Sequence, residues 1–87
     1  SETDIHDQLY AKESELLIKL TIANMPEQRR KIFRMSRTQE KSNQEIAEIL
    51  SLSVETVKSY KKQGKALLYK RLKDVIPLAL LTSILQF

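Results

Sequence analysis

Residues 43–60, with the sequence NQEIAEILSLSVETVKSY, constrain the fold of this chain more than any other stretch. Apolar side chains recur at helical spacing on both sides of Ser51-Leu52-Ser53, which predicts two short helices joined by a tight turn. Ala47 is small enough to let the second helix approach the first, and Leu52 fills the angle between them. The order of the inward-facing positions is specific for a helix-turn-helix: Ile46, Ala47, Leu50, Leu52, Val57 and Tyr60.

Residues 5–24 and 26–37 are expected to form two helices ahead of this motif. Asn24 and Pro26 end the first of them, because the residue before a proline avoids helical dihedral angles. Its apolar residues recur at spacings of three, four or seven, and we expect the buried ones to be Leu9, Leu16, Leu17, Leu20 and Ala23. Pro26 is a favoured first residue for the second helix. That helix is expected to bury Ile32 and Phe33, with either Met35 or Ser36.

Start signals mark the two helices of the motif itself. Ser42, followed three residues later by Glu45, is a capping box for a helix over residues 43–50. Ser53 is expected to cap a long helix over residues 54–75. The inward stripe of that helix is Val57, Tyr60, Gly64, Leu67, Leu68, Leu72 and Val75. Because glycine weakens a helix by about 1 kcal/mol relative to alanine, Gly64 indicates either close approach of another helix or a local kink.

Residues 75–87, VIPLALLTSILQF, form an apolar tail that Pro77 separates from the long helix. A membrane-spanning helix needs about 20 consecutive apolar residues, so the tail is too short to be one. We expect the tail to pack on the first helix at Leu9, Leu16 and Leu20, or on a second copy of the chain in a homodimer. The sequence therefore predicts an all-α domain of four to five helices with an apolar C-terminal helical tail.

Positive charge is concentrated in two stretches, residues 29–41 and residues 58–73, and the net charge of the chain is +4. Residues 1–20 are net acidic. Such segregation suits a polyanionic partner, because each phosphate that a basic side chain neutralises releases condensed counterions. A solvated helix face is the equally simple alternative for the basic stretches.

The second helix of the motif presents polar and basic side chains outward, as a reader of the DNA major groove does. Glu55 could accept a hydrogen bond from a cytosine amine, and Lys58 could donate to guanine acceptors. Glu55 has an alternative role as an ordinary first-turn acid that stabilises the helix. The backbone amides near the start of residues 43–50 suit a phosphate. We assign phosphate contacts to Asn43, Gln44, Ser53, Lys61 and Lys65.

Three ordered blocks carry a resemblance to a known family: MPEQRRKIF at residues 25–33, SNQEIAEIL at residues 42–50 and SVETVKS at residues 53–59. They resemble region 4 of sigma-70 family factors, and look most like the extracytoplasmic-function subgroup. The apolar tail is similar to that of Bacteroidetes members. The resemblance covers about residues 25–73. It divides the chain into an N-terminal linker and amphipathic helix (1–24), a helix-turn-helix domain (25–74) and the tail (75–87).

The resemblance implies a function. Region 4 of such a factor recognises the −35 promoter element, docks the flap of the RNA polymerase β subunit and is commonly held by an anti-sigma factor. Carried onto this chain, the base-reading contacts fall on Glu55, Thr56, Lys58, Ser59 and Lys62. The polymerase contact falls on the second helix and on the end of the long one. Region 2, which opens the −10 element, is absent from the sequence. We therefore expect a cytoplasmic domain of a longer factor.

The chain departs from the family pattern at several positions. Ser51 and Glu40 stand where glycine is usual, and Ser51 lies at a position that needs a positive φ. Lys61 replaces a usual leucine and Gln63 a frequent arginine. These departures leave the expected fold unchanged, but they leave the promoter sequence undetermined.

Two other functions compete with this one. A LuxR-type output domain of a response regulator has a similar pattern on four helices, although the MPEQRR block argues against it. A helical protein-interaction module would explain the tail but leaves the helix-turn-helix pattern unexplained. Catalysis has little support, because the only histidine is His6, without metal-ligand spacing. We expect no catalytic residue, metal, cofactor or small-molecule substrate. The lack of cysteine fits a reducing compartment.

Overall fold

The computed structural model describes the backbone of residues 2–87 and the side chains from Tyr10 onward. These residues form helices without any strand, in the order α1 (Glu2–Ala23), α2 (Glu27–Arg37), α3 (Asn43–Leu50), α4 (Val54–Leu72) and α5 (Leu78–Ile84). The expected all-α class with a C-terminal helical tail is confirmed. Over the same residues, no helix combines the length and the apolar character that crossing a membrane requires.

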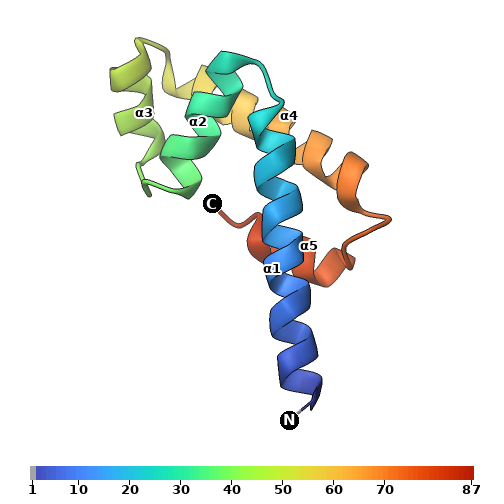
Figure 1. Ribbon diagram of the computed structural model, residues 1–87. Helices are drawn as coiled ribbons and strands as arrows, with labels where there is room; N and C mark the ends of the chain where they lie inside the picture. Colours follow the sequence, from blue (N-terminus) through green and yellow to red (C-terminus); the bar gives the residue numbers. More distant parts are fainter. Residues whose placement is uncertain (1) are drawn as a thin grey trace.

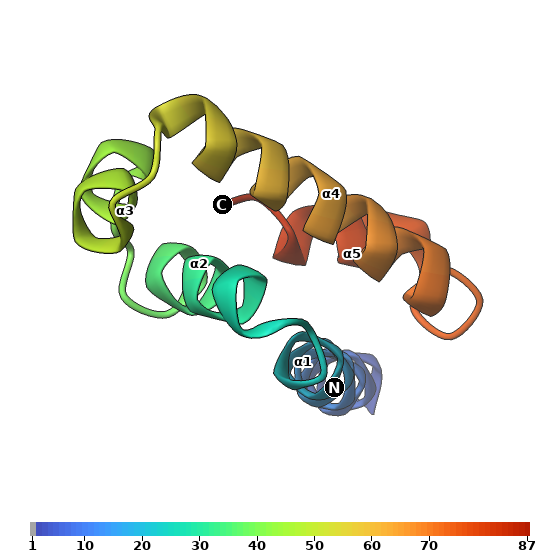
Figure 2. The same cartoon turned by 90° about the horizontal axis from the view of Figure 1, so that it is seen from above.

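The C-terminal residues turn back against α4, where the Lys65 ammonium group donates to the Phe87 carbonyl oxygen. The helix-turn-helix pair α3 and α4 packs against α2, and α1 runs away from this group as a long rod (Figure 1). Seen from above, α2 and α5 lie between α1 and α4, and the C-terminus lies on the inner side of the bend that α2, α3 and α4 make (Figure 2). The last residues of the chain are thereby placed next to the two helices of the motif.

The helix boundaries follow the local signals in the sequence. The hydroxyl of Ser42 accepts a hydrogen bond from the backbone N–H of Glu45 at 3.1 Å, and the Glu45 carboxylate accepts one from the Ser42 N–H at 3.0 Å. This capping box is confirmed. The hydroxyl of Ser53 caps α4 by accepting from the Thr56 N–H at 3.0 Å. Pro26 precedes the first residue of α2 instead of forming it, with an extended ψ of 149°.

Two positions adopt a left-handed backbone conformation without being glycine. Ser51 ends α3 with a φ of 55°, and Glu40 in the loop after α2 has a φ of 53°. The positive φ expected at Ser51 is confirmed. A side chain there makes the left-handed conformation costlier than it is for glycine.

The helix-turn-helix has the expected core. Its fully buried residues are Ile32 of α2 and the motif residues Ile46, Ala47 and Val57. Half-buried side chains close the edges of this cluster, among them Leu50, Leu52 and Tyr60. The predicted inward set is confirmed in full. α2 also buries Phe33 and Ser36, with Met35 half-buried.

A second cluster lies around Phe33 of α2 and joins that helix to α1, α4 and the tail. It contains Ile18, Met25, Phe33, Leu68, Leu72, Ile76, Leu81 and Leu85. Gly64 of α4 lies directly against the Phe33 ring, so that a Cβ atom added at Gly64 would overlap two ring carbons. The close approach predicted at Gly64 is confirmed, and α4 continues through this position as one helix.

The expected buried face of α1 is wrong. Leu16, Leu17 and Leu20 are exposed, with 58%, 39% and 53% of their surface accessible, and Ala23 is exposed as well. The buried residues are Ser14 and Ile18, on the opposite side of the helix, with Ile22 half-buried next to them. Because successive residues turn by about 100° around a helix, α1 has two apolar stripes. The side chain of Leu9 lies outside the described residues.

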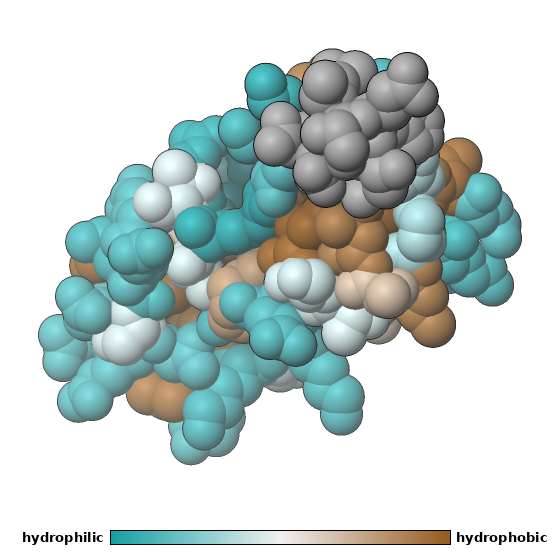
Figure 3. Space-filling model, turned by 90° about the horizontal axis from the view of Figure 1, so that it is seen from below, coloured by the Kyte–Doolittle hydropathy of each residue, from teal (hydrophilic) through white to brown (hydrophobic). Residues whose placement is uncertain are grey.

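The tail also packs differently from the expectation. Leu81 and Leu85 of the tail belong to the same cluster as Ile18, so α5 meets α1 at Ile18 and not at the exposed leucines. The long helix ends at Leu72, and Ile76 takes the buried place expected for Val75, which is 55% exposed. Apolar surface remains visible from below (Figure 3). A homodimer through the tail stays a prediction.

Candidate nucleic-acid interface

The first turns of α4 present their polar side to solvent. Val57 is fully buried and fixes the inner side of the helix against α3. The residues on the other side are exposed, and they are Glu55, Lys58, Ser59 and Lys62. A helix anchored on one side and polar on the other has the form of a helix-turn-helix recognition helix. The structure therefore leaves these sequence-predicted side chains accessible to a nucleic acid.

Thr56 and Ser53 act together at the start of α4. The Ser53 hydroxyl donates to the Thr56 hydroxyl at 2.8 Å and accepts from the Thr56 backbone N–H. Thr56 is half-buried, whereas Ser53 is exposed. These hydrogen bonds satisfy a free N–H group of the first turn. A base or phosphate contact by either hydroxyl would have to compete with this cap.

A basic groove runs between the start of α3 and the side of α4. Its volume is about 600 Å³, and its lining residues are Asn43, Lys58, Lys61, Lys62, Lys65, Ala66, Tyr69 and Phe87. The groove brings together members of both predicted sets: the base-reading residues Lys58 and Lys62, and the phosphate-binding residues Asn43, Lys61 and Lys65. Ser53, Glu55 and Thr56 lie outside it, nearer the N-terminus of α4, and Ser59 also lies outside it. Gln44 is exposed at the start of α3.

Two lysines of the groove are partly desolvated. The ammonium group of Lys61 donates to the side-chain oxygen of Asn43 at 2.9 Å. Burial lowers the pKa of Lys61, and the positive charge of Lys65 lowers it further. Burial also lowers the pKa of Lys65, whose ammonium group lies 4.5 Å from the centre of the Phe87 ring and donates to the Phe87 carbonyl oxygen. A phosphate in the groove would favour the charged form of both side chains.

The start of α3 combines an anion-binding helix end with an acid. The backbone amides at an α-helix N-terminus attract anions. Glu45 already occupies part of this position, because its carboxylate accepts the Ser42 N–H. That backbone hydrogen bond, then the Ser42 hydroxyl, lowers the pKa of the Glu45 carboxyl group. A DNA phosphate at this helix end would therefore meet the free amides near Asn43 and Gln44 beside a negative side chain.

Some residues of the interface carry no signal in the sequence. Phe87 and Tyr69 line the groove, although Phe87 lies more than 20 residues along the chain from the lysines that it touches. Gln63 accepts a hydrogen bond from Arg29 of α2 at 2.9 Å, and the Arg29 guanidinium lies 5.4 Å from the centre of the Tyr60 ring. These contacts tie α2 to the inner and lateral sides of α4, and only the packing of the helices creates them.

Comparison with protein families identifies a match. A family model described as "Sigma-70, region 4" matches residues 15–68, which is more than half of the chain and includes α2, α3 and most of α4. The match begins inside α1, ahead of the expected start at residue 25. No curated protein and no solved structure matches the chain.

The family carries a function that the geometry of α3 and α4 suits. Sigma-70 region 4 is a DNA-binding regulatory domain and not a catalytic family, and its members serve sigma factors in transcription initiation. The match assigns the chain to this family. The extracytoplasmic-function and Bacteroidetes assignments stay predictions. The chain has a helix-turn-helix with an exposed polar face, and the family model matches more than half of its sequence. The chain therefore belongs to the sigma-70 region 4 family.

Proposed function

We propose that this domain recognises the −35 element of a promoter through the first turns of α4. The observation that carries the proposal is the exposed set formed by Glu55, Lys58, Ser59 and Lys62. Lys58 and Lys62 also line the basic groove, together with Lys61 and Lys65. Side chains near the N-terminus of a recognition helix reach base edges in the major groove. Thr56 is the least accessible of the base-reading residues that the family resemblance implies.

The basic groove is the proposed site for the phosphates of one DNA strand. Lys61 and Lys65 flank it, and Asn43 places the start of α3 at its edge. Phosphate contacts fix the register and orientation of a protein on the duplex, whereas base contacts carry the sequence preference. Lys58 and Lys62 line the groove on the exposed side of α4 and are placed to serve both kinds of contact.

The proposal includes docking to RNA polymerase. In the family resemblance, region 4 binds the flap of the β subunit and is held by an anti-sigma factor. The exposed basic residues Lys70 and Arg71 at the end of α4, Lys73 directly after it, and the exposed basic side chains of α2 support a surface for other proteins apart from the base-reading turns. The domain would then connect the polymerase to the promoter as part of a longer factor that also opens the DNA.

Selection from a random duplex pool tests the base-reading proposal directly. The domain is expected to enrich one short motif, and the enriched duplex should bind more tightly than a scrambled duplex of the same composition. The matched control is Lys70→Ala, which removes an exposed charge late in α4 and should leave the enriched motif unchanged. Recovery of no motif, or of the same motif by a variant that lacks Glu55, Lys58 and Ser59, would refute base reading by α4.

A binding assay with the isolated β flap tests the docking proposal separately. We expect the domain to be retained by immobilised flap at moderate salt, and Lys58→Ala to be retained equally, because Lys58 lies on the DNA side. Loss of retention with Lys58→Ala would place the polymerase contact on the base-reading turns and contradict the proposed division of surfaces.

A further inference from the structure

Phe87 lies against two lysines of the basic groove. Its carbonyl oxygen accepts a hydrogen bond from the ammonium group of Lys65, which also lies 4.5 Å from the centre of the Phe87 ring. The ammonium group of Lys61 lies 5.9 Å from the same centre. A cation over the face of an aromatic ring is attracted by the negative charge of its π-electrons. Phe87 therefore contacts two of the four lysines that line the groove.

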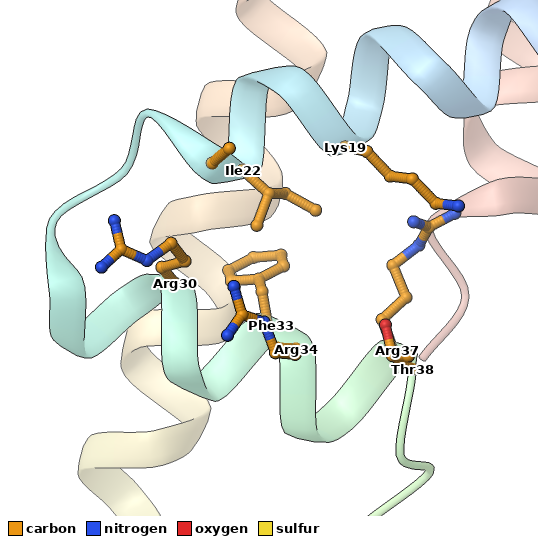
Figure 4. A pocket seen from close by; sticks show the side chains of 8 residues that line it. Lys19, Ile22, Arg30, Phe33, Arg34, Arg37 and Thr38 are labelled. Atoms are coloured by element: carbon orange, nitrogen blue, oxygen red, sulfur yellow. The ribbon is translucent and has the colours of Figure 1, made fainter.

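The Phe87 ring is itself held from the side of α2. Its centre lies 5.4 Å from the centre of the Phe33 ring, at an interplanar angle of 77°, which is the edge-to-face arrangement that aromatic pairs favour. The Arg37 guanidinium lies 5.9 Å from the centre of the Phe87 ring and is paired with Glu15 of α1. Phe33 and Arg37 both extend from α2 toward α1 (Figure 4). Side chains of other helices thus fix the ring that the two lysines contact.

The lysines that contact Phe87 are the less accessible ones of the groove. Lys61 and Lys65 are half-buried, whereas Lys58 and Lys62 are exposed. A lysine side chain has many rotamers, and fixing it on a ligand has an entropic cost. Where the folded domain already restricts the side chain, part of this cost no longer opposes binding. A contact that fixes Lys61 and Lys65 would therefore raise their affinity for an anion.

We propose that Phe87 is a positioning residue, which holds Lys61 and Lys65 in the orientation that binds a DNA phosphate. This role rests on the function proposed for the basic groove. Phe87 lines the groove, and a volume of about 600 Å³ lies beside it. An ammonium group carries three N–H donors, so the hydrogen bond to Phe87 leaves donors of Lys65 for a phosphate. The ring supports the lysines and does not take the place of the phosphate.

Phe87→Leu tests the ring, because leucine keeps an apolar side chain against Phe33 but has no π-electrons. Binding of a fluorescently labelled duplex of scrambled sequence to the complete chain is followed by anisotropy at several salt concentrations. We expect Phe87→Leu to weaken binding about three- to tenfold. The slope of log K against log salt should stay unchanged, because the same phosphates are contacted. Phe87→Tyr, which restores the ring, should bind within about twofold of the parent.

A double-mutant cycle separates positioning from a general loss of structure. In a Lys61→Ala/Lys65→Ala background, Phe87→Leu should change the affinity by less than about twofold, because the ring then has neither lysine to hold. The matched control is Ile18→Val, which removes one methyl group from the cluster that contains Phe33 and does not touch the groove lining. It should also change the affinity by less than about twofold. Circular dichroism checks that every variant folds.

The outcomes distinguish the role of Phe87 from the function of the groove. The proposal is overturned if Phe87→Leu leaves binding unchanged, or if it strengthens binding, since Phe87 would then compete with the phosphate. An equal effect of Phe87→Leu with and without the two lysines, or an equal effect of Ile18→Val, overturns it as well. These results would leave the phosphate site intact. If Lys61→Ala/Lys65→Ala bound DNA as tightly as the parent, the phosphate-binding groove and the positioning role would both be refuted.

Discussion

The ammonium group of Lys61 and the side-chain oxygen of Asn43 lie 2.9 Å apart, which joins the flank of α4 to the first residue of α3. Lys61 is half-buried on the side of α4. Here it spans the two helices of the motif at the edge of the basic groove. Burial lowers the pKa of Lys61, because it removes water from the charged ammonium group. The negative charge of a phosphate in the groove would offset this cost and favour the charged form.

Lys58→Ala should relax the sequence preference of DNA binding. Lys58 is exposed on the first turns of α4, where a side chain reaches base edges. The loss should be about 1–3 kcal/mol for the preferred duplex and much smaller for a scrambled one. Fluorescence anisotropy with both duplexes measures the difference. An equal loss with the two duplexes would show that Lys58 contacts only phosphates.

Lys65→Ala should weaken binding to all duplexes alike. The Lys65 side chain lines the groove, away from the first turns of α4. Removing one phosphate contact should reduce the slope of log K against log salt by about 1. Titrations at several salt concentrations measure this slope, and the slope of the parent domain should itself be steep. A salt-independent affinity in the parent would remove the basis for the phosphate-binding groove.

Gly64→Ala should destabilise the domain. The added Cβ atom would overlap the Phe33 ring, and such overpacking costs about 1–3 kcal/mol. The helix propensity of alanine returns about 1 kcal/mol of that cost. Urea unfolding measures the net change, and the same substitution should cost less in a Phe33→Leu background. If the cost were identical in both backgrounds, contact with the ring would not be its cause.

The tail should contribute to stability through Leu81. Leu81 of α5 is fully buried in the second cluster, so Leu81→Ala should lower the free energy of unfolding by about 2–5 kcal/mol. Leu78 is 63% exposed in the same helix, and Leu78→Ala should change stability by less than about 0.5 kcal/mol. Deletion of residues 78–87 should lower stability or change the oligomeric state. If the deletion variant had the same thermal unfolding midpoint and the same oligomeric state as the parent, packing of the tail on the domain would be ruled out.

Ser42→Ala should weaken α3 and change the response to acid. Loss of an N-cap serine costs about 1 kcal/mol. The hydrogen bonds from Ser42 hold the pKa of Glu45 below its ordinary value of 4.5. Their contribution is therefore fully present above pH 4.5 and is lost as the pH falls through the lower pKa of the folded chain. Unfolding measured from pH 3 to 6 should show a shallower acid-induced loss in the variant. An unchanged acid limb would mean that the Ser42 hydroxyl does not contribute to the lowered pKa of Glu45 and that the Ser42 backbone N–H, which the variant keeps, is its cause.

Much of the fold could be predicted from the sequence because its causes are local. The capping residues Ser42 and Ser53, the left-handed Ser51 and the break at Pro77 act on their own neighbours in the chain. The buried set of the helix-turn-helix was equally predictable, because its two helices are short and joined by a fixed turn. The exposed face of α4 then follows, since the opposite side of the helix is anchored at Val57.

Only the tertiary structure decided which side of α1 is buried. The helix has one apolar stripe with Leu16 and Leu20 and another with Ile18 and Ile22, and helical periodicity fits both. Packing against α5 and Phe33 selected the isoleucines and left the leucines exposed. It also brought Phe87 to Lys65, across more than 20 residues of chain. Local sequence determines where helices begin and end, whereas contacts between distant residues depend on how the whole set of helices fills its common core.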